Sequence, residues 1–106
     1  MAYDEELAAR VRDLVAEHGP AEEKKMFGGL AFMLGGHMAC CVSGQGGLLL
    51  RVGEDALPDL LGEHVAPMQM GAQVSSSWAR VAPEALTTDD ELAAWVARGV
   101  AGAVRD

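Results

Sequence analysis

The 106-residue chain is poor in aromatic and basic side chains. Aromatic residues make up 5% of it, and eight Lys and Arg residues stand against 16 Asp and Glu, which gives a formal net charge of −8. Proteins that bind nucleic acids unaided usually cluster Lys and Arg against the phosphates and stack aromatic rings on the bases. Here the basic residues are scattered from Arg10 to Arg105. The composition therefore disfavours independent binding of DNA or RNA.

Long apolar runs and a disulfide framework are also missing. No stretch approaches the roughly 20 apolar residues of a membrane helix. The N-terminal sequence MAYDEEL is acidic, whereas a signal peptide begins basic and then becomes apolar. The two cysteines, Cys40 and Cys41, are neighbours and cannot close a stabilising loop, which fits a reducing compartment. We expect a cytoplasmic protein that does not enter a membrane.

Three helices are expected from the spacing of apolar residues. Residues 4–18 place apolar side chains at helical intervals and carry acids in the first turn. Residues 54–64 also look helical, although Pro58 costs a backbone hydrogen bond unless the helix begins near it. Thr88 and Glu91 form a capping box, which predicts that the last helix begins there.

Five strands are expected between these helices. The first three, joined by glycine-rich hairpin turns, are MFGGLAFML at 26–34, HMACCVS at 37–43 and LLLRV at 48–52, and two weaker candidates lie around PMQMG at 67–71 and SSSWARV at 75–81. The order α-βββ-α-ββ-α predicts one α+β domain over residues 1–106, an antiparallel sheet of about five strands with helices packed on it.

His37, Cys40 and Cys41 are the candidate reactive residues. Strand alternation places Cys40 with Met38 and Val42, and Cys41 on the opposite face with His37. Two ligands on one face are too few for a metal, and His37 is the one local base for a thiolate. We therefore expect packed, structural thiols and no catalytic, cofactor or metal site. The alternative is a small metal- or thiol-dependent sensor or enzyme that uses these three residues.

The first predicted strand is unusual because neither of its faces is polar. One face carries Met26, Gly28, Leu30, Phe32 and Leu34, and the other carries Phe27, Gly29, Ala31 and Met33. Such a strand belongs to a sheet covered on both sides, by helices on one and by a loop, a partner protein or a second copy on the other. Exposing Phe27, Met33 and Leu49 together leaves an apolar patch that a soluble monomer rarely tolerates. We expect Phe27→Asp to abolish such contacts and leave the fold largely intact.

Several segments resemble the N-terminal domain of the TfoX/Sxy family. They are EKKMFGGLAFMLGGHMACCV, the LLLRVG that follows it, the opening MAYDEELAARVR and the closing helix with Trp95. The resemblance implies a small α+β fold related to secretion-chaperone-like domains. The best-known relatives regulate natural competence alongside the cyclic-AMP receptor protein and carry a second, helical domain. Because this sequence stops at Asp106, we expect the N-terminal domain alone.

The resemblance supplies no catalytic motif and leads to a functional expectation. The positions that match the family's distinguishing residues are Lys25, Phe27, Gly28, Gly29 and Arg51, and they are the candidates for an interaction surface. We expect a small non-enzymatic regulatory domain that acts through protein contacts, with an unidentified protein partner or by self-association. A second alternative is an accessory DNA-binding module.

Overall fold

The computed structural model describes residues 3–26, 28–44, 46–70 and 72–104, which form an α+β domain with one antiparallel sheet. The helices are α1 (Glu5–Ala16), α2 (Leu57–Leu60) and α3 (Asp89–Val104), with a 3₁₀ turn at Pro83–Ala85. The strands are β1 (Ala21–Met26), β2 (Gly29–Leu34), β3 (His37–Val42), β4 (Leu48–Arg51), β5 (Val65–Met70) and β6 (Gln73–Val81). The sheet order is β1-β2-β3-β4-β6-β5. Within this described part, no helix has the length and apolar character that crossing a membrane requires.

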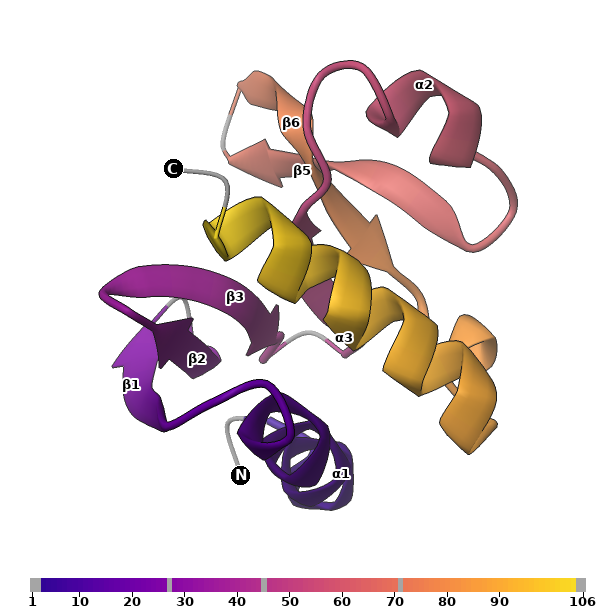
Figure 1. The fold of residues 1–106 in the computed structure, drawn as a ribbon. Helices are drawn as coiled ribbons and strands as arrows, with labels where there is room; N and C mark the ends of the chain where they lie inside the picture. The colour runs from indigo at the N-terminus through magenta and orange to yellow at the C-terminus, as the bar shows by residue number, and fades with distance from the viewer. Residues whose placement is uncertain (1–2, 27, 45, 71, 105–106) are drawn as a thin grey trace.

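Two long helices cover one face of the sheet. Helix α3 lies across β3 and β4 and also contacts α1 (Figure 1). Asp4 caps α1 by accepting hydrogen bonds from the Glu6 and Leu7 amides at 3.0 and 3.1 Å. At the start of α3 the Glu91 amide donates to Thr88 Oγ1 over 3.1 Å, as the capping box predicts.

Glycines let α3 lie close to the sheet backbone. A Cβ atom added to Gly99 would lie 2.2 Å from the Ala39 carbonyl oxygen, and one added to Gly102 would lie 2.7 Å from the Arg51 carbonyl oxygen. Both distances are too short for a real Cβ. The two glycines therefore set how closely the helix approaches β3 and β4.

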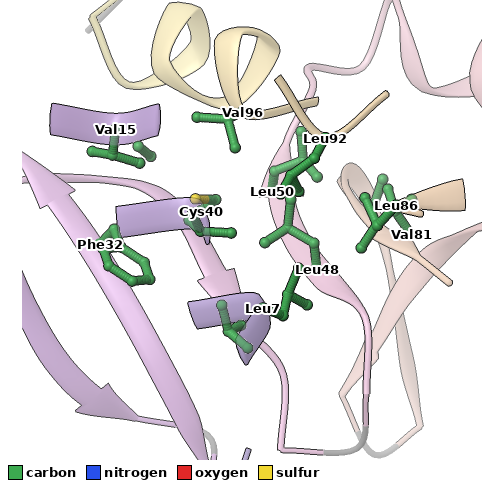
Figure 2. Packing of buried hydrophobic residues seen from close by; sticks show 14 of the residues in the cluster. Leu7, Val15, Phe32, Cys40, Leu48, Leu50, Val81, Leu86, Leu92 and Val96 are labelled. Atoms are coloured by element: carbon green, nitrogen blue, oxygen red, sulfur yellow. The ribbon is translucent and has the colours of Figure 1, made fainter. Parts of the chain in front are cut away.

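The helix-side core lies between the sheet and its helices. Figure 2 shows Cys40 in this core together with Phe32 of β2 and Val96 of α3. Each helix contributes buried side chains, with Val11 from α1 and Leu57 from α2 among them. Burial of this apolar surface is the main favourable contribution to the free energy of folding.

The predicted strand at 26–34 is wrong at its beginning. Gly28 lies outside the strands with a φ of +73°, a backbone conformation that favours glycine, and β2 begins at Gly29. Met26 instead ends β1, the strand at Ala21–Met26 that the sequence interpretation missed. The sheet consequently has six strands in the described residues, where about five were expected. Because β1 is an edge strand whose charged residues are all exposed, it lacks the apolar alternation that reveals a strand.

The second helix is shorter than predicted. The expected helix at 54–64 shrinks to Leu57–Leu60, with Pro58 in its first turn, where a missing amide costs least. Leu61 is already extended, with a ψ of 137°. The two later strands form as β5 and β6, so the predicted element order holds apart from the added first strand.

Candidate interaction surface

The face of the sheet opposite the helices, here called the open face, carries its own apolar cluster. Among the described residues this cluster has eight members, and we call it the methionine cluster. Four members are buried, namely Ala31, Cys41, Leu49 and Met68. The other four, Met26, Met33, Met38 and Trp78, are partly buried and pack against them. All eight come from strands, and each of the six strands contributes at least one. The helices instead contribute their buried side chains to the helix-side core. Both faces of β2 are therefore apolar, as expected, and on the open face the four partly buried side chains pack against the four buried ones.

A bulge in β3 decides which residues join the methionine cluster. Phe32 is opposite Cys40, whereas Met33 is opposite Met38, so Ala39 is an extra residue on β3. Ala39 belongs to the helix-side core, while Met38 packs on the open face. Simple alternation had placed Met38 with Cys40, and that prediction is wrong because it assumed an unbroken strand.

Cys40 and Cys41 point to opposite faces, as expected, and both are fully buried. Burial, with a smaller contribution from the neighbouring thiol, raises the pKa of Cys40 to about 12. Burial also raises the pKa of Cys41, although the charge of Arg80 opposes this rise. Both thiols are therefore protonated near neutral pH.

The structure does not bring the three candidate reactive residues together. His37 is exposed at the beginning of β3, while Cys40 and Cys41 lie in separate apolar clusters. Across the residues described, no three His, Cys, Asp or Glu side chains are arranged to share a metal ion. The geometry of these residues offers no nucleophile paired with a base.

Two of the candidate interaction residues have backbone roles, and a third cannot be placed. Gly28 is exposed, and a Cβ atom added to it would have no neighbour within 4 Å. A Cβ on Gly29 would lie 2.0 Å from the Val42 carbonyl oxygen, so this residue permits β2 and β3 to approach. Phe27 lies outside the described residues, and the substitution predicted for it stays a prediction.

The two charged candidates lie in different places. Lys25 is exposed on β1 and faces Leu30, a helix-side residue, so it does not point to the open face. Arg51 is partly buried on β4 opposite Trp78 and therefore borders the methionine cluster. Of the two charged candidates, Arg51 lies beside the methionine cluster and Lys25 does not, and their role in binding stays a prediction.

Basic side chains predominate among the charges of the open face. Lys24 is opposite Ala31, and Arg80 is opposite Leu49, so both share this face with Arg51. Glu22, opposite Met33, is the acidic residue among the described strand positions there. This distribution contrasts with the net charge of −8 of the whole chain.

Sequence reasoning missed Met68, Trp78 and Arg80 as members of this surface. The alternation in SSSWARV predicts that Trp78 and Arg80 share one face of a strand, but it does not show which face of the sheet they occupy. Met68 could not have been found this way, because the pairing of β5 with β6 changes register between Pro67 and Gln69.

Comparison with curated proteins and with solved structures gave no match. The family model described as TfoX N-terminal domain matches residues 13–103, nearly the whole chain. With an α+β fold, a two-sided apolar sheet and this match, the chain belongs to the TfoX N-terminal domain family.

Proposed function

We propose that this domain is a non-enzymatic regulatory module that binds another protein through the open face of its sheet. The observation that supports this proposal is the methionine cluster, which spans all six strands and has none of its residues on a helix. Four partly buried side chains, three of them methionines, form its outer layer. Methionine is flexible and polarisable, and surfaces rich in it adapt to the shape of a partner.

The charges around the cluster indicate the chemistry of the partner. Lys24 is exposed and lies on the same face as the methionines, where it can attract a carboxylate. We therefore infer that the partner presents apolar side chains flanked by Asp or Glu. Free, protonated cysteines fit action in the reducing cytoplasm. A regulatory role agrees with the resemblance to the TfoX/Sxy family, whose best-known relatives regulate natural competence.

Neighbouring residues of β2 provide a matched pair of variants to test this proposal. Met33→Asp places a carboxylate in the outer layer of the methionine cluster, where solvent can reach it. Phe32→Asp places the same group at a site with no exposure in the helix-side core. We expect Met33→Asp to retain the circular dichroism spectrum and Phe32→Asp to unfold, because a buried, unpaired charge is very costly.

Binding is then measured with a partner identified by affinity capture and purified. Met33→Asp should weaken its binding at least about tenfold, the loss expected when an apolar contact is replaced by a desolvated charge. Glu84→Ala, an exposed change in the 3₁₀ turn, is the control and should bind like the wild type. Equal affinity of the wild type and Met33→Asp would contradict the proposal.

A further inference from the structure

A cavity of about 320 Å³ lies beside the beginning of the edge strand β5 and the end of β6, and Gly46 of the β3–β4 connection also lines it. Its polar lining comes from Arg80, His64 and Glu63, and its apolar lining includes Val65, Ala66 and Pro83. The volume is at the lower end of the range of small-molecule sites in proteins. None of these residues belongs to the methionine cluster.

Arg80 is held at this cavity by neutral acceptors. Its Nη1 donates to Ser43 Oγ over 2.9 Å and to the Gly46 carbonyl oxygen over 3.3 Å. Ser43 is itself buried, with 3% of its surface exposed, and so forms a firm support for the guanidinium group. These bonds fix the position of Arg80 without neutralising its charge.

The charge of Arg80 lacks a partner within the part of the chain that the structure describes. No described carboxylate lies within 4.0 Å of its guanidinium nitrogens, and Nε and Nη2 have no described hydrogen-bond acceptor. The nearby Cys41 thiol is neutral, because burial raises its pKa. The remaining N–H groups of Arg80 can therefore donate hydrogen bonds to an anion bound in the cavity.

We propose that this cavity binds a small organic carboxylate, which accepts hydrogen bonds from the free N–H groups of Arg80. The planar guanidinium fork matches a carboxylate in a bidentate arrangement. Val65, Ala66 and Pro83 provide an apolar wall for a short hydrocarbon group attached to the carboxylate. Glu63 also lines the cavity and repels any anion, but it repels a doubly charged ligand such as phosphate more strongly than a singly charged carboxylate. Arg80 itself lies on the open face, but no residue that lines the cavity belongs to the methionine cluster, so this small-molecule site goes beyond the proposed protein contact.

Titration of the ¹⁵N-labelled protein with benzoate, followed by amide NMR shifts, tests the proposal. Benzoate should shift the amides of Gly46, Val65 and Ala66, whereas benzamide, a neutral molecule of nearly the same shape, should not. Arg80→Gln should weaken benzoate binding by at least about tenfold, because it removes a charge-assisted bidentate contact. Arg98→Gln is the matched control, since Arg98 lies over the Trp95 ring on α3, and it should bind like the wild type.

Other outcomes overturn the proposal. They are shifts that do not map to the cavity, equal weakening by the Arg80 and Arg98 substitutions, and tighter binding of inorganic phosphate than of benzoate. If Arg80→Gln does not fold, Ser43→Ala replaces it in the test. This variant removes the hydrogen bond between Ser43 Oγ and the Arg80 guanidinium group but keeps the positive charge of Arg80. Ser43→Ala should then weaken binding, and unchanged affinity in that variant counts against the site.

Discussion

Cys40 and Cys41 are adjacent in sequence but stabilise different layers of the molecule. Cys40 packs with Phe32 and Val96 beneath the helices, and Cys41 lies beneath the methionines of the open face. Their separation follows directly from the alternation of side chains along β3. Because both thiols are protonated, each behaves as a small hydrophobic side chain.

The two thiols should respond differently to replacement by serine. Cys40→Ser should lower the free energy of unfolding by about 1–3 kcal/mol, because it buries a hydroxyl in an apolar core. Cys41→Ser should cost less, since the Val42 carbonyl oxygen lies 3.7 Å from the sulfur and can accept from a hydroxyl after a small shift. Urea unfolding of both variants measures the difference. A larger loss for Cys41→Ser would contradict this assignment of the two environments.

At the scale of elements, β1 combines an exposed sheet edge with four consecutive charged residues. Its sequence AEEKKM leaves one side of the strand unpaired at the end of the sheet. Glu23 also forms an ion pair with Arg12 of α1, with a distance of 2.9 Å between Nη2 and Oε1, and this contact lowers the pKa of Glu23. Charged side chains on an edge strand oppose pairing with the edges of other molecules.

Removing charges from β1 should therefore promote association. The double variant Glu22→Val, Lys24→Val extends the apolar open face to the edge of the sheet and raises the β-propensity of the strand. Sedimentation velocity should show oligomers in this variant at concentrations where the wild type shows none. The double variant Glu84→Val, Arg98→Val also removes one acid and one base, at exposed sites outside the sheet, and it should sediment like the wild type. Equal association of both double variants would show that the position of the changes at the sheet edge is not the cause.

The elements differ in how far the sequence could predict them. Strands β2 and β3 were predictable because they are apolar and flanked by glycines such as Gly35 and Gly36, which have φ angles of +58° and +85°. β1 was not, since exposure on both faces removes the periodic signal. The contact between Arg80 and Ser43 joins residues far apart in the chain, and no local pattern encodes such a pairing.

At the scale of the whole molecule, the position of α3 holds the two halves of the sheet together. The helix lies over β3 and β4, the middle strands, and its Gly99 and Gly102 lie against backbone carbonyls of the sheet (Figure 1). A side chain at either glycine would lift the helix away from the sheet. The close contact also allows Leu92 and Val96 of α3 to be fully buried.

Gly99→Ala should accordingly destabilise the protein by about 1–3 kcal/mol, the usual cost of overpacking a tight contact, despite the higher helix propensity of alanine. Thermal unfolding monitored by circular dichroism measures this loss. Gly62→Ala is the matched control, because a Cβ there meets no neighbour within 4 Å, and it should change stability by less than about 0.5 kcal/mol. If Gly99→Ala is as stable as this control, the helix is not held as closely as described.

The strand order also determines when each part of the molecule becomes protected during folding. β1 to β4 pair with their neighbours in sequence, so these hairpins close short loops and can form early. β4 acquires its second partner only when the distant β6 arrives, with Leu48 opposite Val81. Until then the apolar run Leu48–Leu50 forms an unprotected edge in a partly folded chain. We therefore expect newly made molecules to be most prone to aggregate before the β5–β6 hairpin has docked.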